Sequence, residues 1–239
     1  MATAGATPSA SNGTSRRGVL FDVDGTLIDS SYFHTISWWG AFRQFGYDIP
    51  MASIHYYVGM GGARLVDSLL PPDRDRGDDE DIMASHGALY ASRWPSLRPF
   101  AGAGELLAHC HEAGLAVALA SSAREKDLEV MKDVLGAGGS IDAATSSKDA
   151  KESKPAPDIL AAALEALGVQ PADAVFVGDA VWDMMAAAAL GIPAVGVTCG
   201  GISADVLKDA GAVEVYEGPA DLLRNFDGSA IGKLLTRGS

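Results

Sequence analysis

The sequence predicts an α/β protein with a doubly wound, mostly parallel β-sheet and an inserted all-helical region. Three observations support this prediction. From about residue 101 onward, short apolar segments alternate with helical patterns, as in strands joined by helical crossovers. One apolar strand candidate lies well before them, at residues 18–23. Residues 33–98, in between, show helical patterns and no convincing strand, so we expect a helical cap there.

The composition restricts the class of partner. The chain has 239 residues, of which 48% are hydrophobic and 21% charged, values that are ordinary for a globular protein. A net charge of −13 argues against nucleic acid or an anionic membrane surface as a partner, and no apolar run is long enough to span a bilayer. The cysteines, Cys110 and Cys199, imply no disulfide framework. We therefore expect a cytoplasmic protein with no membrane, nucleic-acid or protein partner.

The N-terminal part of the chain contains one strand and several helical segments. Residues 1–17 are rich in Ala, Ser, Thr and Gly and lack acidic residues, so we expect a disordered tail. After the strand, the apolar pattern at residues 30–46 predicts a helix that Gly46 ends. Shorter helical patterns follow at residues 54–58, 63–70 and 82–94, and the charged run at 73–81 is expected to be a solvated loop.

The C-terminal part predicts the rest of the sheet. Strands are expected at residues 115–120, 141–144, 174–177, 194–197 and 213–215. Helices are expected at residues 104–112, 125–135, 157–167, 184–190 and 204–210. The predicted core domain therefore comprises residues 18–32 and 99–228, and residues 229–239 are expected to be a C-terminal tail.

Two carboxylates, Asp22 and Asp24, stand at the end of the first strand. Side chains alternate along a strand, so both would leave it on the same side and repel each other. Mg²⁺ bound by carboxylate oxygens would compensate this repulsion, and Gly25 would let the backbone turn sharply or approach a ligand closely. An acidic turn without a ligand is the alternative, because Asp-Gly is a common turn pair.

Further polar residues follow the other predicted strands or precede a helix. They are Ser121, Ser122, Lys154, Asp179 and Asp183. Because ligands of doubly wound sheets bind beyond the carboxyl ends of the strands, we expect these side chains to meet. The set suits phosphoryl transfer through a covalent intermediate. One carboxylate can attack phosphorus, another can transfer protons, Mg²⁺ can screen the charge, and hydroxyls with a lysine can hold the phosphoryl oxygens.

Four segments together resemble the motifs of the haloacid dehalogenase superfamily. They are Phe21-Asp22-Val23-Asp24-Gly25-Thr26, Leu119-Ala120-Ser121, Lys154-Pro155 and Gly178-Asp179-Ala180-Val181-Trp182-Asp183. The resemblance extends from about residue 18 to residue 225. The position of the helical cap is similar to that in relatives of phosphoglycolate phosphatase and β-phosphoglucomutase.

The resemblance implies a role for each acidic residue. Asp22 would be the nucleophile and a Mg²⁺ ligand. Asp24 would be the general acid and base, and it would ligate the metal through its backbone carbonyl. Asp179 would be a further metal ligand. Asp183 would support the metal site by contacting these ligands and not the metal itself.

The same resemblance assigns Ser121, Ser122 and Lys154 to the phosphoryl group. The dehalogenases of this superfamily lack a carboxylate at the position of Asp24. The phosphonatase branch uses a cap lysine, whereas this chain has no lysine before Lys126. The expected function is therefore a Mg²⁺-dependent phosphatase that acts on a small phosphorylated metabolite.

Two alternatives stay open. One is a sugar-phosphate mutase like β-phosphoglucomutase, which uses a histidine at the position of His34. A mutase must also grip a second phosphate, and only Arg43, Arg64, Arg93 and Arg98 could do so in the cap. Arg64 matches the cap arginine of that enzyme only in a shifted register, and His34 could instead pack at the domain junction. The other alternative is a non-catalytic phosphate-binding protein on the same fold.

The cap contains further candidates for contact with a substrate. Trp38, Trp39, Tyr56 and Tyr57 could line a pocket, although aromatic residues at helical spacing often belong to a core. The segment 59–62, Gly-Met-Gly-Gly, is expected where the cap backbone approaches the substrate or the core domain. None of these residues identifies the substrate.

Overall fold

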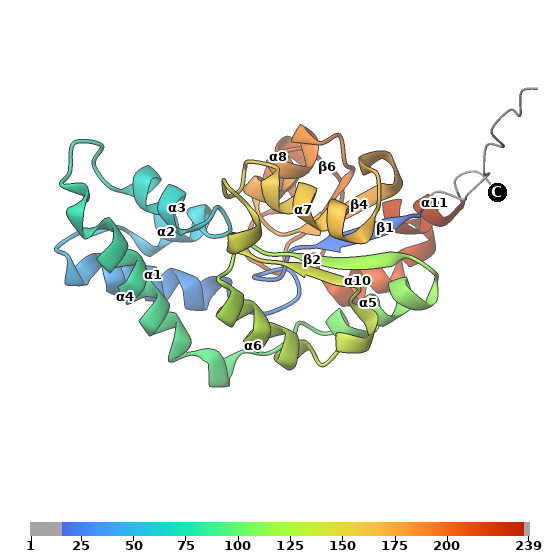
Figure 1. The fold of residues 1–239 in the computed structure, drawn as a ribbon, viewed down its shortest axis with the longest axis horizontal. Helices are drawn as coiled ribbons and strands as arrows, with labels where there is room; N and C mark the ends of the chain where they lie inside the picture. The colour runs from blue at the N-terminus through green and yellow to red at the C-terminus, as the bar shows by residue number, and fades with distance from the viewer. Residues whose placement is uncertain (1–15, 237–239) are drawn as a thin grey trace, which may run out of the picture.

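The computed structural model describes residues 16–236, and its centre is a six-stranded parallel β-sheet (Figure 1). The strands are β1 (Gly18–Phe21), β2 (Ala116–Ala120), β3 (Ala143–Thr145), β4 (Ala174–Gly178), β5 (Ala194–Val197) and β6 (Ala212–Tyr216). Their order is β3-β2-β1-β4-β5-β6, so the first strand of the chain lies in the middle of the sheet. The doubly wound α/β class predicted from the sequence is confirmed.

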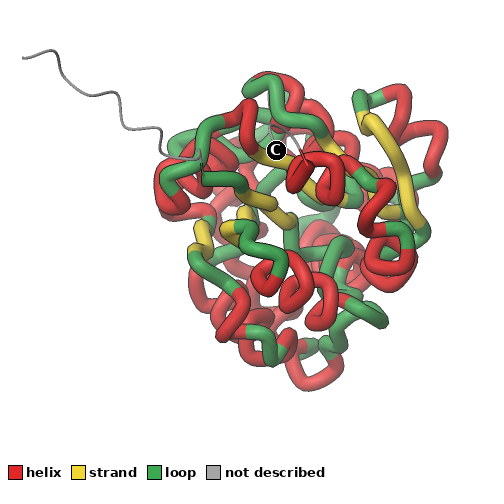
Figure 2. Tube along the Cα trace, turned by 90° about the vertical axis from the view of Figure 1, so that its right-hand side faces the viewer, coloured by secondary structure: helices red, strands yellow, loops and turns green. Residues whose placement is uncertain are grey.

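Helices cover both faces of the sheet, as the side view in Figure 2 shows. They are α5 (Ala103–Glu112), α6 (Glu125–Leu135), α7 (Asp158–Leu167), α8 (Val181–Ala189), α9 (Ala204–Asp209), α10 (Pro219–Arg224) and α11 (Ala230–Thr236). Because side chains alternate along a strand, Val19 and Phe21 of β1 pack with α5, α6, α10 and α11, whereas Leu20 packs with α7, α8 and α9. All three side chains are fully buried, as expected for the central strand of a parallel sheet.

Residues 31–91, which follow β1, form four helices that we call the helical block. They are α1 (Ser31–Gln44), α2 (Met51–Tyr57), α3 (Gly62–Leu69) and α4 (Asp79–Ala91). The helices pack around an apolar cluster of their own, with Trp38, Phe42, Ile54, Leu65 and Ile82 buried in it. In Figure 1 the block lies to the left of the sheet, with α1 and α4 side by side.

Short 3₁₀ turns connect several of these elements. They are Arg76–Asp78, Trp94–Ser96, Gly138–Ser140, Ser147–Asp149, Pro171–Asp173 and Phe226–Gly228. The charged run at residues 73–81 is mostly exposed, as expected, but Arg74 is an exception. The Arg74 side chain is only 2% exposed and forms ion pairs with Asp67 at 2.7 Å and Asp79 at 2.8 Å. These pairs fix the connection between α3 and α4.

Both ends of the described chain are more structured than the sequence predicted. Residues 230–236, expected in a C-terminal tail, form α11, and Ile231 and Leu234 are buried in the core. Arg16 and Arg17, expected in the N-terminal tail, donate hydrogen bonds to the carbonyls of residues 167 and 235, at 2.7 and 2.5 Å. The rest of that expected tail, residues 1–15, lies outside the described residues. No described helix combines the length and apolar character needed to cross a membrane.

Candidate active site

A buried ion-pair cluster lies at the carboxyl ends of the central strands. Asp22 follows β1, its backbone N–H donates to Val177 O of β4 at 2.9 Å, and the residue is only 4% exposed. Lys154 comes from the loop before α7 and is fully buried. Its Nζ lies 2.5 Å from Asp22 Oδ1 and 2.8 Å from Asp183 Oδ1, and it donates to Ala120 O at 3.1 Å. One ammonium group therefore serves two carboxylates.

Carboxylates outnumber cations in this cluster. Oxygens of Asp22, Asp179 and Asp183 lie within 4.8 Å of one another. Burial, reinforced by the charge of Asp183, raises the pKa of Asp22 to about 8 in spite of Lys154. Burial and the neighbouring carboxylates also raise the pKa of Asp179 well above its ordinary value. Burial lowers the pKa of Lys154, but Asp183 and Asp22 outweigh it and raise that pKa. A divalent cation with oxygen ligands would balance the remaining negative charge.

Close backbone packing sets the position of Asp179. Gly25 adopts a φ of +77°, and a Cβ at this position would lie 2.3 Å from Asp179 Oδ2. A Cβ on Gly200 would lie only 1.7 Å from the same oxygen. Asp183 Oδ2 accepts hydrogen bonds from the backbone N–H of Asp179 at 3.2 Å and of Ala180 at 3.0 Å. The loop after β4 is therefore held in place by Gly25 and Gly200, which pack against Asp179, and by the hydrogen bonds to Asp183.

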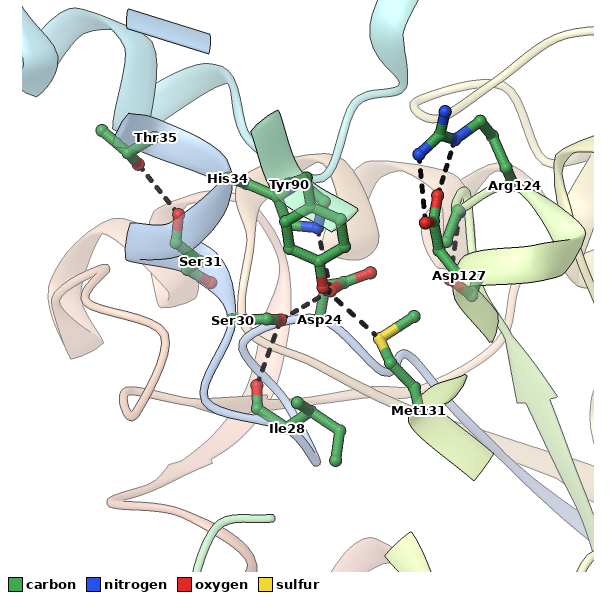
Figure 3. A network of polar contacts seen from close by, with 12 residues as sticks. Asp24, Ile28, Ser30, Ser31, His34, Thr35, Tyr90, Arg124, Asp127 and Met131 are labelled. Atoms are coloured by element: carbon green, nitrogen blue, oxygen red, sulfur yellow. Dashed lines mark hydrogen bonds and ion pairs between the residues drawn. The ribbon is translucent and has the colours of Figure 1, made fainter. Parts of the chain in front are cut away.

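Asp24 has a separate set of partners, which converge on one of its oxygens in Figure 3. Ser30 Oγ, His34 Nε2 and Tyr90 OH lie 2.5, 3.0 and 3.3 Å from Asp24 Oδ1. Burial alone would raise the pKa of Asp24. The charge and hydrogen bond of His34, with the hydroxyl hydrogen bonds, outweigh burial and lower that pKa. Because Tyr90 comes from α4, the helical block completes the surroundings of this carboxylate.

Stacked rings connect Asp24 to the interior of the helical block. The His34 and Tyr90 rings are stacked with centroids 3.8 Å apart, and His34 Nδ1 lies 3.1 Å from His86 Nε2. The His86 ring is stacked on Trp38 at 3.9 Å. Burial, with positive charge nearby, lowers the pKa of His86 well below its ordinary value. His86 is therefore uncharged at neutral pH and can share one hydrogen with His34.

A cavity of about 260 Å³ lies between the helical block and the strand ends, and both Asp22 and Asp24 line it. The helical block contributes His34, Trp38, Val58, Gly59, Gly61, Gly62, Ala63, Leu65, Met83 and His86. The core contributes Ser122, Ala123, Arg124, Asp127 and Ser147. A cavity of this size suits a small ligand.

Comparison with known proteins identifies the family of this chain. A protein-family model described as haloacid dehalogenase-like hydrolase matches residues 17–191. The chain belongs to this family. A hydrolase from Pseudomonas syringae has a similar structure, with a TM-score of 0.85 and 30% identity over 89% of this chain and 99% of that chain. The resemblance carried by the four motifs is thereby confirmed.

Two curated relatives of this haloacid dehalogenase-like hydrolase differ in length. Phosphoglycolate phosphatase of Neisseria meningitidis is 30% identical, and the match covers 77% of this chain and 81% of the relative. Protein SUPPRESSOR OF QUENCHING 1, chloroplastic, of Arabidopsis thaliana is 30% identical over 92% of this chain. The chain spans only 21% of the length of that plant protein.

The predicted site residues lie in the buried ion-pair cluster, around Asp24 or at the cavity, except Ser121 and Arg64. Ser122 lines the cavity, and its buried Oγ has no hydrogen-bond partner among the described residues. Ser121 does not line the cavity and is only 1% exposed. Its Oγ accepts a hydrogen bond from the backbone N–H of Ala123 at 3.0 Å. Arg64 forms an ion pair with Glu152 and does not line the cavity, so the structure does not bring it to the candidate site as expected.

The four aromatic candidates separate into two groups. Trp38 lines the cavity, whereas Trp39, Tyr56 and Tyr57 do not. Tyr56 and Tyr57 instead contact Trp182 at the start of α8. Trp182 Nε1 donates to Tyr56 O at 3.1 Å, and its ring is stacked with Tyr57 at 5.6 Å between centroids. The helical block and the core domain are therefore in direct contact beside the site.

Several residues near the site were not predicted. His86 and Tyr90 lie one turn apart on α4 and so face the same way, a spacing that the sequence does contain. Arg124 and Asp127 form a two-point ion pair, with Nε to Oδ2 at 2.6 Å and Nη2 to Oδ1 at 3.0 Å (Figure 3). Arg124 Nη2 also donates to Gly87 O of α4 at 3.2 Å. The position of Arg124 shortly after Ser121 and Ser122 in the sequence could have indicated that it lies near the site.

Proposed function

We propose that this hydrolase is a Mg²⁺-dependent phosphatase that acts on a small phosphorylated metabolite through an aspartyl-phosphate intermediate. The observation that carries the proposal is the position of Asp22. Its carboxylate lines a cavity of about 260 Å³, with Lys154 Nζ 2.5 Å away and Asp24 at the same cavity. The name of the Neisseria relative, a phosphoglycolate phosphatase, supports phosphomonoester chemistry.

The proposed reaction has two steps. In the first, Asp22 attacks phosphorus, and an Oδ–P bond forms while the bond to the leaving-group oxygen breaks. Asp24 gives a proton to that oxygen. In the second step Asp24 takes a proton from the water that hydrolyses the aspartyl phosphate. The hydrogen bonds from His34, Ser30 and Tyr90 favour this base role, and the negative charge of an arriving substrate favours the protonated form that the first step needs.

The carboxylate cluster fits Mg²⁺, a cation that prefers oxygen ligands. We propose Asp22, Asp179 and the backbone carbonyl of Asp24 as its ligands. Both side-chain oxygens of Asp183 are engaged already, by Lys154 and by backbone N–H groups, so Asp183 would support the site. A second cavity, of about 10 Å³ and lined by Asp24 and Asp179, has about the minimum room for one water molecule. When bound, Mg²⁺ would reduce the repulsion between the nucleophile and the phosphoryl group.

We propose that the helical block acts as the cap expected over residues 33–98. Its backbone approaches the core domain closely: a Cβ would lie 3.2 Å from Ala180 Cβ if added to Gly59, and 2.5 Å from Ser153 Cβ if added to Gly61. Gly61 has a φ of +88°, a conformation that favours glycine. Closure of the block would exclude water during the attack by Asp22, and opening would release the product.

The runner-up, a sugar-phosphate mutase, needs a cationic site for a second phosphate. Arg43 and Arg64 form ion pairs with surface carboxylates, and Arg98 donates to backbone carbonyls. Arg93 lines a different groove. None of the four is among the described residues that line the cavity. These positions favour hydrolysis over transfer to a second position on the same sugar.

The test is phosphate release from p-nitrophenyl phosphate and small phosphomonoesters, with Mg²⁺ or with EDTA. We expect release only with Mg²⁺, and a loss of about 10³-fold or more in Asp22→Asn, because the nucleophile is removed. Asp48→Asn is the matched control, since Asp48 is an exposed partner of Arg43 and should leave the rate unchanged. An active Asp22→Asn variant would overturn the proposal. Conversion of β-glucose 1-phosphate to glucose 6-phosphate without phosphate release would favour the mutase.

A further inference from the structure

Apart from His34 and His86, the wall of the cavity formed by the helical block is apolar. Trp38 and Leu65 are almost fully buried in the block, and both line the cavity together with Met83. Gly62 closes this wall: a Cβ there would lie 3.4 Å from the Trp38 ring and 3.5 Å from Met83 Sδ. A ligand that fills the cavity therefore meets indole, aliphatic and thioether surface on the side of the helical block.

The cationic side chain of the cavity is already paired with a carboxylate of the protein. Arg124 is the only Lys or Arg among the described residues that line it. Two hydrogen bonds bind its guanidinium to Asp127, which is 4% exposed, and a third reaches the carbonyl of Gly87. His34 is engaged by Asp24 at 3.0 Å, and the buried His86 is bound to His34.

We propose that the leaving group of the substrate is an uncharged alcohol with an apolar face, and not a group that carries a carboxylate, a second phosphate or an ammonium. This inference rests on the proposed phosphatase function and specifies its substrate class. A second anion would lose its hydration beside Asp24 and Asp127, and it would meet a guanidinium whose charge Asp127 already balances. An ammonium would find Asp127 already paired with Arg124. A neutral hydroxyl carries no charge, so its loss of hydration in the cavity costs much less.

Three substrates of nearly equal size separate these possibilities: 2-hydroxyethyl phosphate, phosphoglycolate and phosphoethanolamine. Their leaving groups differ mainly in charge. We expect kcat/KM for 2-hydroxyethyl phosphate to exceed each of the other two by about tenfold or more. Equal or faster hydrolysis of phosphoglycolate or of phosphoethanolamine would overturn the inference and leave the phosphatase intact. No release from any of them or from p-nitrophenyl phosphate would overturn both.

A charge placed in the cavity provides a second test. Ala63 is exposed and lines the cavity, so Ala63→Lys adds an ammonium there with little cost to folding. We expect the ratio of kcat/KM for phosphoglycolate to that for 2-hydroxyethyl phosphate to rise by about tenfold, because the carboxylate then has a partner. Met83→Lys is the second variant at the same cavity. Met51→Lys adds the same charge to an exposed residue of α2 outside the cavity and should leave the ratio unchanged. An unchanged ratio in both cavity variants would contradict the inference.

Discussion

At the scale of single residues, Gly200 is the position that most strictly limits the candidate metal site. A Cβ there would lie 1.7 Å from Asp179 Oδ2, so Gly200→Ala must displace that carboxylate. We expect the Mg²⁺ concentration for half-maximal phosphate release to rise about 10- to 100-fold, as for other changes next to metal ligands. A Mg²⁺ titration of the initial rate measures this shift, and the rise in melting temperature with Mg²⁺ gives a second readout.

Gly138→Ala is the matched control for this prediction. Gly138 lies in a 3₁₀ turn with no atom within 4 Å of an added Cβ. It should therefore leave the Mg²⁺ dependence unchanged. If Gly200→Ala retained the Mg²⁺ dependence of the natural chain, Asp179 would not be a metal ligand.

The residues that the sequence predicted well are those fixed by the ends of strands. Asp22, Asp179 and Asp183 follow β1 and β4 closely, so the sheet alone brings them together, and Lys154 joins them from the loop before α7. The surroundings of Asp24 could not be predicted in the same way. Tyr90 reaches Asp24 only because α4 packs against α1, which is a tertiary contact between segments far apart in the chain.

At the scale of elements, the contact between α2 and the start of α8 joins the helical block to the core domain. Trp182→Ala removes the hydrogen bond to Tyr56 O and the stacking on Tyr57. We expect kcat/KM to fall by about tenfold, because about 1 kcal/mol or more of the closed arrangement is lost. The melting temperature should change little, since the block and the core each have an apolar cluster of their own.

Trp182→Phe tests the same contact more finely. It retains an aromatic ring for Tyr57 and loses only the N–H donor, so a smaller decrease in kcat/KM is expected than for the alanine variant. Steady-state kinetics with thermal unfolding of both variants provides the comparison. Unchanged kinetics in Trp182→Ala would show that cap closure does not depend on this contact.

Among the elements, the apolar strands were predicted best, because a strand that is buried on both faces of a parallel sheet consists almost entirely of apolar residues. Helix α11 was missed because it has only 7 residues, too few to show a clear helical pattern in the sequence. Ile231 and Leu234 become part of the core only where the sheet lies beside them. The ion pairs of Arg74 in the exposed charged run could not be predicted for a related reason: one partner, Asp67, belongs to the preceding helix.

At the scale of the whole molecule, the raised pKa of Asp22 couples stability to pH. This pKa is about 8 in the folded protein and 3.8 ordinarily, so the folded state favours the protonated carboxyl. Its contribution to stability is complete below pH 3.8 and is lost as the pH rises toward 8. At pH 8 in EDTA, the free energy of unfolding of Asp22→Asn should therefore exceed that of the natural chain by on the order of 1 kcal/mol or more.

Urea unfolding of both chains at pH 5 and pH 8 measures this difference. The gain of Asp22→Asn should shrink at pH 5, where the natural carboxyl is already protonated in the folded state. Mg²⁺ should stabilise the natural chain at pH 8 more than the variant, because binding requires the ionised carboxylate. A variant that is less stable at pH 8 in EDTA would mean that Lys154 outweighs burial at this position.

The central place of β1 also determines when the molecule can become active during its synthesis. Asp22 and Lys154 are 132 residues apart, and the strands that flank β1 both come later in the chain. A growing chain can assemble the helical block from neighbouring helices, while β1 still has no strand with which to pair. The candidate site is therefore complete only late in synthesis, because a nascent chain that has not yet reached Asp183 lacks part of it.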